Sequence, residues 1–445
     1  MQNENIAALS TGNVASGVAV IRISGSSPLA VAEKMFRPTG KTAVKDFKPN
    51  VMYVGEIEAD GFSDFGMCVY FRAPLSFTGE DTVEFHSHGG IAITQGILRK
   101  IFSLGVRPAT NGEFTKRAFM NGKLSLSSAE GLIDMINSES QSGVRAGYYL
   151  YREKLLKQVS DVQESLTDLL SQIDVDMDFP EEDLEADYTL SAKAVLTECI
   201  DRLNALIGTY RVGRVLKNGV NVGIIGKPNT GKSSTLNALL NYDKAIVSSV
   251  AGTTRDVVEG VIEINGVRFN LSDTAGIRDS EDLIEGIGVE LSKKIVGSSD
   301  LLLFIIDGSN YDGYDEAVFK LIEGKNALVV VNKTDVSDFK HPKADLYISA
   351  LKKENIDSLR EMLYARSVGG GVDLSGDFLC EERHFDALTR AKDKLVTALN
   401  ALGTVSLDMV AIDIKDGWDA LGEISGKTAT EEIINNIFAK FCVGK

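Results

Sequence analysis

The sequence predicts a multidomain protein: an α+β N-terminal domain, an α-helical bundle domain, and an α/β domain inserted into that bundle. A length of 445 residues exceeds one ordinary domain and suggests about three. Helical periodicity runs through 123–217 and returns after 372, whereas 218–371 alternates apolar strands with turns and helices. We therefore expect domain segments at 1–122, 123–217, 218–371 and 372–445, the second and fourth being two parts of one helical domain.

The composition is that of a globular protein and excludes several classes. The hydrophobic fraction is 44% and the formal net charge is −16, which argues against a general nucleic-acid binder, so any nucleic-acid contact must be local. No span approaches transmembrane length, and the start of the chain lacks the pattern of a signal peptide, so we expect no membrane contact and a cytoplasmic location. Four cysteines lie far apart without a CxxC pair, which argues against a disulfide framework and a structural zinc site.

The N-terminal segment mixes strands and helices. A strand is predicted at Gly17 to Ser24, followed by a helix around Leu29 to Phe36. Further strands are predicted at Met67 to Phe71 and Thr82 to His86, and this mixture indicates an α+β domain.

Polar residues on the predicted strands of this domain have ordinary explanations. His86 and His88 would share one face of a strand, as metal ligands do, but no third ligand with suitable spacing is apparent, so a metal site is the weaker interpretation. Arg22 and Glu84, taken alone, are typical of ion-pairing groups.

The helical domain shows one apolar face in its first part. That face carries Leu155, Val159, Val162, Leu166 and Leu169. A further helix is predicted through Leu196 to Leu206, and periodicity resumes after a glycine run with Phe385, Leu388, Leu395 and Leu399. The simplest interpretation is one bundle interrupted by the α/β domain, which could rotate on two nearby hinges.

The α/β domain is organised around one phosphate-binding pattern. An apolar run, Val220 to Ile225, predicts a buried strand, and the loop GKPNTGKS at 226–233 leads into a helix that begins near Lys232. Backbone N–H groups of such a loop converge on phosphate oxygens, Lys232 reaches the outer phosphates, and Ser233 offers a hydroxyl to Mg²⁺. The alternative is a glycine-rich turn without a ligand, but the strand before it and the helix after it favour binding.

Three later motifs point to a guanine nucleotide. The strand 267–272 runs into Asp273-Thr274-Ala275-Gly276, which would place Asp273 beside the metal. Ala327 to Val331 ends in Asn332-Lys333-Thr334-Asp335, where the Asp335 carboxylate can accept from the guanine N1–H and 2-amino group together. Ser349-Ala350-Leu351 then forms a last loop over the base. The four motifs in this order predict a Ras-like P-loop GTPase.

The catalytic arrangement departs from the Ras-like pattern. The position after the Asp273–Gly276 motif, where a glutamine orients the attacking water, holds Ile277. Thr254 is the natural switch hydroxyl for Mg²⁺, and an acid downstream must replace the glutamine. Glu285 is one candidate, although by composition alone it would be a solvated acid on a loop.

The last predicted helix begins with a capping-box pattern at 428–431, TATE, and runs to the chain end. By themselves, Cys442 is a small core residue and Lys445 a frayed end.

Gly-Thr-Thr-Arg-Asp at 252–256, Asp-Thr-Ala-Gly at 273–276 and the terminal Cys442-Val443-Gly444-Lys445 together resemble the tRNA-modification GTPase family MnmE, also called TrmE, and the likeness covers the whole chain. In that family hydrolysis is stimulated by potassium, and the water-positioning acid matches Glu285. The resemblance implies K⁺ ligands at Asn229, Ser248, Val250 and Thr253, beside the Mg²⁺ ligands Ser233 and Thr254. Ser248 stands where the family commonly has threonine, and it keeps the hydroxyl.

With the motifs above, the predicted GTP-binding residues are Asn229, Thr230, Gly231, Lys232, Ser233, Ser234, Ser248, Thr253, Thr254, Asp273, Thr274, Ala275, Gly276, Asn332, Lys333, Asp335, Ser349, Ala350 and Leu351.

The resemblance also assigns a second site. The family's N-terminal domain is similar to tetrahydrofolate-binding domains and mediates dimerisation, and its folate contacts match Arg22, Glu84, Lys123 and the terminal Lys445. A pterin edge offers donors to a carboxylate, while a glutamate tail offers carboxylates to arginine and lysine. Cys442 matches a thiol implicated in the modification. The loop at 13–16 departs from a glycine-rich basic turn of many relatives, and Val443 replaces a common isoleucine.

The implied function is that of a GTPase which, as a homodimer with an FAD-dependent partner, MnmG, adds an aminomethyl or carboxymethylaminomethyl group to the wobble uridine of tRNA. The one-carbon unit would come from a 5-formyl or methylene tetrahydrofolate, and GTP hydrolysis would open and close the site. The alternative from another class is a regulatory GTP switch that binds ribosomes or rRNA and has no modification chemistry. A folate-binding domain and a cysteine-bearing terminus favour the enzyme.

Overall fold

The computed structural model describes residues 4–178, 185–240, 260–273, 296–369 and 377–444. The chain forms two compact units. Unit 1 comprises Met1–Ile133, Leu150–Ala186 and Asp393–Lys445, and unit 2 comprises Asp134–Tyr149 and Asp187–Lys392. The predicted four segments divide the chain differently and stay a prediction. In the described part of the chain, no helix is long and apolar enough to cross a membrane.

Unit 1 contains a mixed sheet built by the N-terminal segment, and seven strands of it lie in the described residues, in the order β3-β4-β5-β6-β2-β1-β7. The central strands β4, β5, β6 and β2 are antiparallel to their neighbours, and β7 is parallel to β1. The strands are β1 (Ile6–Leu9), β2 (Ser16–Gly25), β3 (Phe36–Pro38), β4 (Met52–Glu58), β5 (Ser63–Phe71), β6 (Asp81–Gly89) and β7 (Arg107–Pro108).

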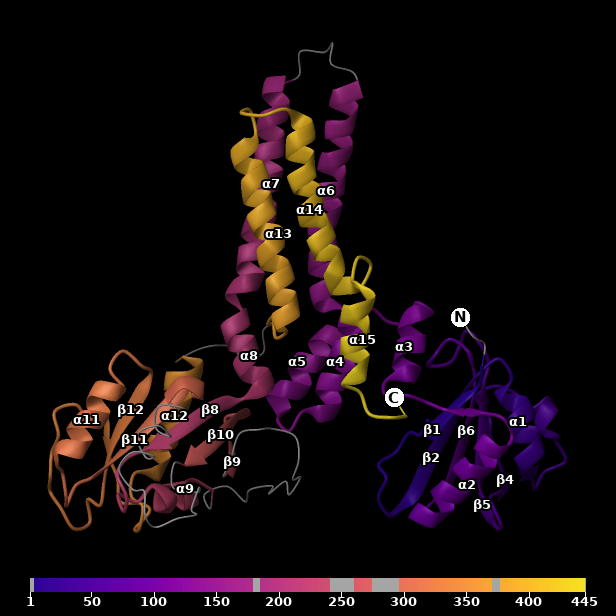
Figure 1. Cartoon of the computed structure of the whole chain (residues 1–445), viewed down its shortest axis with the longest axis horizontal. Coiled ribbons are helices and arrows are strands. Elements are labelled where there is room, and N and C mark those ends of the chain that lie inside the picture. The colour runs from indigo at the N-terminus through magenta and orange to yellow at the C-terminus, as the bar shows by residue number, and fades with distance from the viewer. Residues whose placement is uncertain (1–3, 179–184, 241–259, 274–295, 370–376, 445) are drawn as a thin grey trace. The chain divides into compact units, whose positions relative to one another are not determined.

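Successive side chains of each strand point to opposite faces of this sheet, so their alternation determines which residues pack against the helices. On β2, Ile21 and Ile23 point into a core that also contains Phe85 of β6. Helices α1 (Pro28–Met35) and α2 (Ile91–Ser103) supply the other side of that core through Met35 and Ile97, among others. Figure 1 shows both helices beside the sheet. The opposite face therefore receives the intervening residues, among them Arg22 and Glu84.

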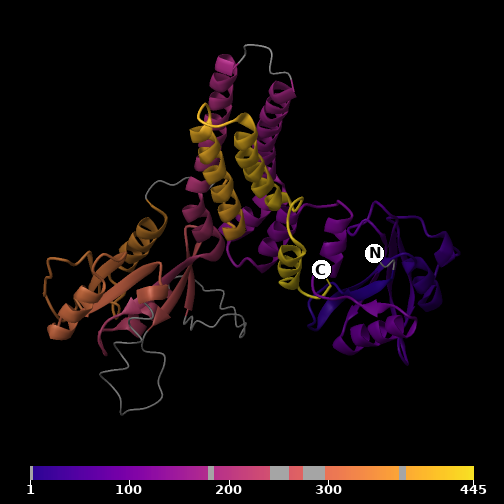
Figure 2. The same ribbon diagram turned by 45° about the horizontal axis from the view of Figure 1, so that its top comes forward.

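The helical part of unit 1 includes α3 (Glu113–Met120), α4 (Leu126–Asn137), α6 (Lys154–Asp178), α14 (Leu407–Ser425) and α15 (Glu431–Ala439), although α4 ends in unit 2. The predicted apolar face of α6 is confirmed, because Leu155, Val159, Val162, Leu166 and Leu169 are all buried. Helices α6 and α14 lie side by side in Figures 1 and 2, and Gln163 donates to the Trp418 carbonyl at 3.0 Å.

The predicted capping box of the last helix is wrong in position. The N-cap of α15 is Thr430, whose hydroxyl accepts from the Ile433 N–H, and the helix begins at Glu431. Thr428 is not available as a cap, since its hydroxyl donates to the Asp419 carbonyl at 2.8 Å.

Unit 2 contains a second sheet, and the described residues give its order as β13-β12-β11-β8-β10-β9. Strands β13 through β10 are parallel to their neighbours, and β9 is antiparallel to β10. The elements of this domain are β8 (Val220–Ile225), α9 (Lys232–Leu240), β9 (Gly260–Ile264), β10 (Val267–Asp273), β11 (Leu301–Asp307), α11 (Gly313–Leu321), β12 (Ala327–Asn332), β13 (Leu346–Tyr347) and α12 (Ile356–Val368).

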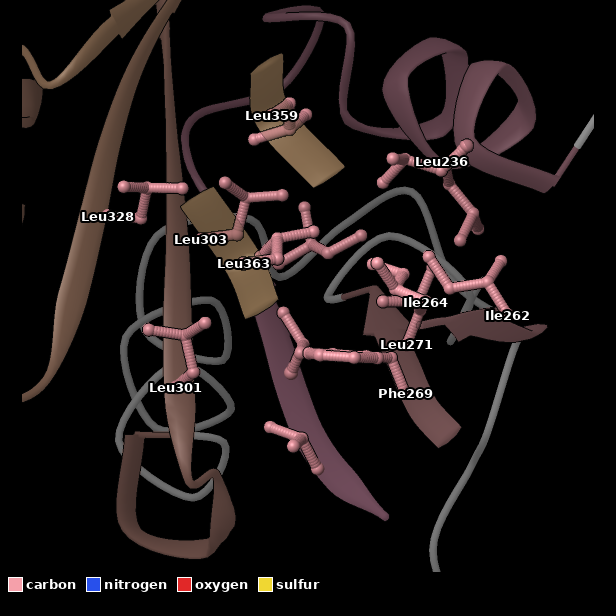
Figure 3. Packing of buried hydrophobic residues seen from close by; sticks show 14 of the residues in the cluster. Leu236, Ile262, Ile264, Phe269, Leu271, Leu301, Leu303, Leu328, Leu359 and Leu363 are labelled. Carbon is pink, nitrogen blue, oxygen red and sulfur yellow. The ribbon is translucent and has the colours of Figure 1, made fainter. Parts of the chain in front are cut away.

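The hydrophobic core of this domain forms where apolar side chains of the strands pack against the helices. Figure 3 shows Phe269 and Leu271 of β10 among Leu236 of α9 and Leu363 of α12. Strand β11 is buried along its full length, as expected for a central parallel strand covered on both faces. The predicted α/β domain is therefore confirmed, and β8 has the bounds predicted for it.

In the sequence, α8 precedes this domain and α13 follows it. The remaining helices are α5 (Gln141–Tyr151), α7 (Glu185–Gly208), α8 (Tyr210–Asn218) and α13 (Glu382–Ala401); α8 belongs to unit 2, and the other three are divided between the units. At the entry point, the Lys217 ammonium lies 2.8 Å from Asp134 Oδ1 and also pairs with Glu381, which precedes α13. Burial, followed by the nearby Glu381 carboxylate, raises the pKa of Asp134 to about 8.

Candidate functional site

The predicted phosphate loop adopts a conformation that its residue types require. Gly226 and Gly231 have φ angles of 147° and 92°, and Asn229 has 65°. A Cβ on Gly226 would lie 2.4 Å from the Ile305 carbonyl oxygen, and a Cβ on Gly231 would lie 2.2 Å from Asn332 Nδ2. Glycine is therefore required at both positions, while asparagine tolerates the left-handed region better than most residues.

Lys232 is held inside this loop at the first position of α9. Its Nζ donates to the Gly226 carbonyl at 3.0 Å and to the Lys227 carbonyl at 3.1 Å. Thr230 Oγ1 also donates to the Lys227 carbonyl, at 3.0 Å. The arrangement sets an ammonium group at a helix N-terminus, where an anion is stabilised by both the charge and the helix dipole.

Asn332, at the end of β12, joins the phosphate loop to the predicted last loop over the base, residues 349–351. Its Nδ2 donates to the Thr230 carbonyl at 2.9 Å, and its Oδ1 accepts from the Ala350 N–H at 3.0 Å. Asp335 accepts a hydrogen bond from the buried Ser349 hydroxyl at 2.8 Å through Oδ1. Segments far apart in sequence thus meet at one edge of the sheet, where parallel strands of α/β domains present ligand sites.

Two carboxylates that the sequence did not single out support these loops. Asp307, at the end of β11, pairs with Lys333 at 2.6 Å. Asp315 of α11 pairs with Lys227 at 2.9 Å. Their partner lysines lie in predicted nucleotide-binding motifs, but nothing in the local sequence connects either lysine to its acid.

Several predicted site residues lie outside the described residues. They are Ser248, Val250, Thr253, Thr254, Thr274, Ala275, Gly276, Ile277, Glu285 and Lys445. Asp273 is described only as the last residue of β10, where its backbone pairs with Ile224 of β8, next to the start of the phosphate loop.

The second predicted site lies in unit 1. Arg22 of β2 and Glu84 of β6 are direct cross-strand partners, and Arg22 Nε donates to Glu84 Oε1 at 2.8 Å. The Arg22 guanidinium also lies over the rings of Phe77 and Phe114, at 5.2 and 5.6 Å. Burial raises the pKa of Glu84, but nearby His86 and the charge and hydrogen bond of Arg22 outweigh burial and hold that pKa below its usual range. Glu84 is therefore an anionic acceptor at neutral pH.

Lys123 lies beside the loop between β5 and β6, which contains Phe77 and Gly79 and is called the Phe77 loop below. Its side chain approaches Gly79, where an added Cβ would be 3.3 Å from Lys123 Cγ, and neighbouring Asn121 donates to the Thr78 carbonyl at 2.7 Å. Phe77 of this loop contacts Arg22, so the structure brings Arg22, Glu84 and Lys123 to the surroundings of one loop.

The two histidines have separate acidic neighbours. His88 Nδ1 lies 2.7 Å from Asp64 Oδ1, and His86 Nε2 lies 3.5 Å from Glu84 Oε2. Within the described ranges, no group of three or more histidine, cysteine, aspartate or glutamate side chains could hold a metal ion.

The C-terminal tail packs on the N-terminal segment within unit 1. The Cys442 carbonyl accepts from the Gly112 N–H at 3.4 Å, and Val443 bridges to Asn111. Gly444 has a φ of 101°, and an added Cβ would lie 2.0 Å from the Leu9 carbonyl oxygen. The exposed thiol of Cys442 is thus carried next to the segment 111–114, whose Phe114 contacts Arg22.

Comparisons with known proteins identify relatives over the full length. Residues 126–442 match the family described as the MnmE helical domain, and residues 5–123 match the family described as the GTP-binding protein TrmE N-terminus. The tRNA modification GTPase MnmE of Natranaerobius thermophilus is 37% identical, with 100% of both chains covered. The protein of the same name from Alkaliphilus oremlandii is 36% identical, covering 100% of this chain and 99% of the relative. Among solved structures, a point variant of Aquifex aeolicus Era bound to GDP.AlF4- is 30% identical over 39% of this chain and 66% of that chain, with a TM-score of 0.27.

Proposed function

The chain belongs to the MnmE family of tRNA modification GTPases, and on that premise we propose that it hydrolyses GTP in a potassium-stimulated reaction while adding a one-carbon-derived group to tRNA. The group is aminomethyl or carboxymethylaminomethyl, the target is the wobble uridine, and the flavoprotein MnmG is the partner. The observation that best supports this function is that the tail with Cys442 packs on the domain that contains Arg22 and Glu84. Family membership favours this function over a purely regulatory GTP switch.

The nucleotide is held by the loops that Asn332 joins. Lys232 binds the outer phosphates, the backbone from Asn229 to Ser234 surrounds them, and Asp335 accepts from the guanine base. Leu351, which is exposed, and Ala350 close the last loop over the base. Mg²⁺ fits the hydroxyl of Ser233 at the start of α9 together with Thr254, and the main role of this cation is to neutralise charge on the phosphates.

Potassium fits the exposed side chain of Asn229, whose carbonyl oxygen is a suitable hard ligand. Ser248, Val250 and Thr253 complete the proposed ligand set. A monovalent cation there supplies positive charge where other GTPases receive an arginine finger. Glu285 positions the attacking water in place of the missing glutamine.

The folate site uses the charges around the Phe77 loop. Glu84 is ionised and accepts from a donor edge such as that of a pterin, while Lys123 and the terminal Lys445 pair with carboxylates of a glutamate tail. Arg22 orients Glu84 and lies against aromatic rings. Cys442 supplies a thiol near this domain for the modification chemistry.

The dimer is supported by an exposed apolar face on the N-terminal sheet. Met52 and Val54 of β4 and Phe65 of β5 are all exposed, and their register places them on the same side of the sheet as Glu84. A second copy of the chain would cover this face. We place the protein in the cytoplasm.

Calorimetry with 5-formyltetrahydrofolate tests the proposal most directly. The wild-type chain should bind it, and Arg22→Ala should weaken binding by about tenfold or more, because Glu84 loses its partner. Arg37→Ala is the matched control, since Arg37 is a largely exposed arginine of β3 in the same domain. Absence of folate binding, or equal binding by both variants, would reject the folate site.

Hydrolysis rates in KCl and NaCl test the cation separately. We expect faster turnover in KCl, and Asn229→Ala should remove the difference while Mg²⁺-dependent GTP binding persists. Equal wild-type rates in the two salts would reject the potassium site.

A further inference from the structure

The connection between β11 and α11, residues 307–315, contacts both loops of the nucleotide site although it contains none of the predicted nucleotide-binding residues. It begins with Asp307 at the end of β11 and ends in the first turn of α11. Asp312 is the N-cap of that helix, and Asp312 and Asp315 form a reciprocal capping box. The connection is therefore ordered by its own hydrogen bonds, which makes it a firm support for other groups.

At its C-terminal end, the connection holds the phosphate loop through Lys227. The Lys227 ammonium lies 2.9 Å from Asp315 Oδ2 and 3.0 Å from Asp312 Oδ2, and it also donates to the Asn310 carbonyl. The Lys227 side chain is 8% exposed and that of Asp315 is 0% exposed. Burial lowers the pKa of Lys227, but the two carboxylates outweigh burial and raise that pKa overall, so the Lys227 ammonium stays charged.

The backbone of Lys227 carries this attachment into the phosphate loop. Its carbonyl oxygen accepts hydrogen bonds from Thr230 Oγ1 and from Lys232 Nζ. Asp315 fixes the Lys227 side chain, and the carbonyl of the same residue holds Thr230 and Lys232 of the phosphate loop. Loss of the Asp315 charge would leave the buried ammonium of Lys227 with only the half-exposed Asp312 as an anionic partner among the described side chains.

At its N-terminal end, the connection holds the base loop, here the segment 332–335 that ends in Asp335, through Lys333. Asp307 Oδ2 accepts from Lys333 Nζ at 2.6 Å, and Asp307 Oδ1 accepts from the N–H and hydroxyl of Ser309 at 2.8 and 2.6 Å. Lys333 has a φ of 66°, an uncommon conformation for lysine that its surroundings must maintain. Lys333 follows Asn332 directly and precedes Asp335 by two residues.

We propose that Asp307 and Asp315 are positioning residues for GTP, Asp315 acting on the phosphate loop through Lys227 and Asp307 acting on the base loop through Lys333. The inference rests on the proposed nucleotide site. On this proposal, the two ends of the connection act on different parts of the nucleotide. Asp315 affects the binding of every nucleoside triphosphate equally. Asp307 affects the discrimination between guanine and other bases. If Asp307 and Asp315 only stabilised the fold, their variants would not differ in overall nucleotide affinity and in base discrimination.

The test measures equilibrium binding of GTP and ITP to the full chain by fluorescence competition. Inosine lacks the 2-amino group, so the ratio of the two affinities reports contact of the base with Asp335. Asp315→Asn and Lys227→Met should each weaken both ligands by about tenfold or more, with the ratio unchanged. Asp307→Asn should weaken GTP more than ITP and so lower the ratio.

Two further variants make the assignment specific. Combining Lys227→Met with Asp315→Asn should weaken binding little beyond either single change, because both remove one interaction. Lys227→Arg should restore binding to within about threefold of wild type, since arginine also pairs with carboxylates. Lys320→Met, an exposed change on α11, is the matched control.

Binding by Asp315→Asn within about twofold of wild type, or full additivity in the double variant, would overturn the phosphate-loop part of the proposal. An unchanged GTP-to-ITP ratio in Asp307→Asn would overturn the base-loop part.

Thermal unfolding without nucleotide identifies any variant that fails to fold. For that case Asp312→Asn, which removes the exposed partner, should still weaken both ligands, and unchanged binding would count against the proposal. Lys232→Ala tests the underlying site: if it leaves GTP binding intact, the proposed nucleotide site fails rather than the positioning role.

Discussion

Replacing Asp134 by asparagine should remove a pH dependence from the stability of the chain. Asp134 of α4 contacts Lys217 of α8, where the chain enters the α/β domain, and it shares Lys217 with Glu381, which follows that domain in the sequence. Its side chain is 14% exposed, and two carboxylates face one ammonium. Burial, followed by the charge and hydrogen bonding of Glu381, raises the pKa of Asp134 to about 8 from an ordinary 3.8. The folded protein therefore keeps a proton that the unfolded chain has released.

The sign and size of the effect follow from proton linkage. Between the two pKa values the folded state binds one more proton than the unfolded state, so stability falls as pH rises, by about 1.4 kcal/mol per pH unit. The loss ends once the pH passes the folded pKa. From about pH 6 to about pH 9 the wild type should therefore lose about 3 kcal/mol through this group. Asparagine resembles the protonated acid, so Asp134→Asn should match the wild type near pH 6 and exceed its stability near pH 9.

The assay is urea unfolding followed by circular dichroism at several pH values for both proteins. The difference in unfolding free energy between variant and wild type cancels the titrating groups that do not interact with Asp134, so it reports the coupled set of Asp134, Glu381 and Lys217. Asp161→Asn, an exposed change on α6, is the control and should give a difference that does not vary with pH. A constant difference for Asp134→Asn over this range, or a variant that becomes less stable than wild type as pH rises, would refute the reasoning.

Two other changes test the nucleotide edge and the entry to the domain. Asn332→Ala removes two buried hydrogen bonds and leaves the Thr230 carbonyl and the Ala350 N–H unpaired, so GTP affinity should fall by about 2–4 kcal/mol in a binding titration; unchanged affinity would contradict this. Gly213→Ala in α8 would set a Cβ 2.1 Å from the Leu379 carbonyl oxygen and should destabilise the chain by about 1–3 kcal/mol in urea. Gly208→Ala in α7 meets nothing within 4 Å and should be neutral or stabilising by up to about 1 kcal/mol, so equal losses in both variants would contradict the steric argument.

Local patterns allowed the sequence to predict the elements around the phosphate loop. The apolar run 220–225 and the glycines that follow are sufficient to define β8 and the start of α9, because both signals lie within a few residues of each other. The same holds for the apolar face of α6. The misplaced cap of α15 shows the limit of such patterns: Thr428 has the right residue type, but a contact with Asp419 nine residues away takes its hydroxyl.

The connections between distant segments could not be predicted from the residues. The Asn332 contact with Thr230 spans 102 residues, and the Lys227 contact with Asp315 spans 88. In sequence, each of these charged or polar groups is equally typical of a solvated surface. The family resemblance associated the C-terminal tail with the folate residues, but neither the resemblance nor the local pattern indicated that Cys442 packs beside Gly112. Long-range pairing depends on the topology of two sheets, which strand patterns alone do not determine.

Nucleotide selectivity of Asp335→Asn tests the central claim most directly, since it asks whether the base lies at Asp335 while Lys232 binds the phosphates. An asparagine amide can accept from the N1–H of xanthine and donate to its 2-oxo group, but it cannot accept from both donors of guanine. We predict that the variant loses GTP binding by about two orders of magnitude and gains XTP binding. Unchanged GTP affinity with no affinity for XTP would contradict the account.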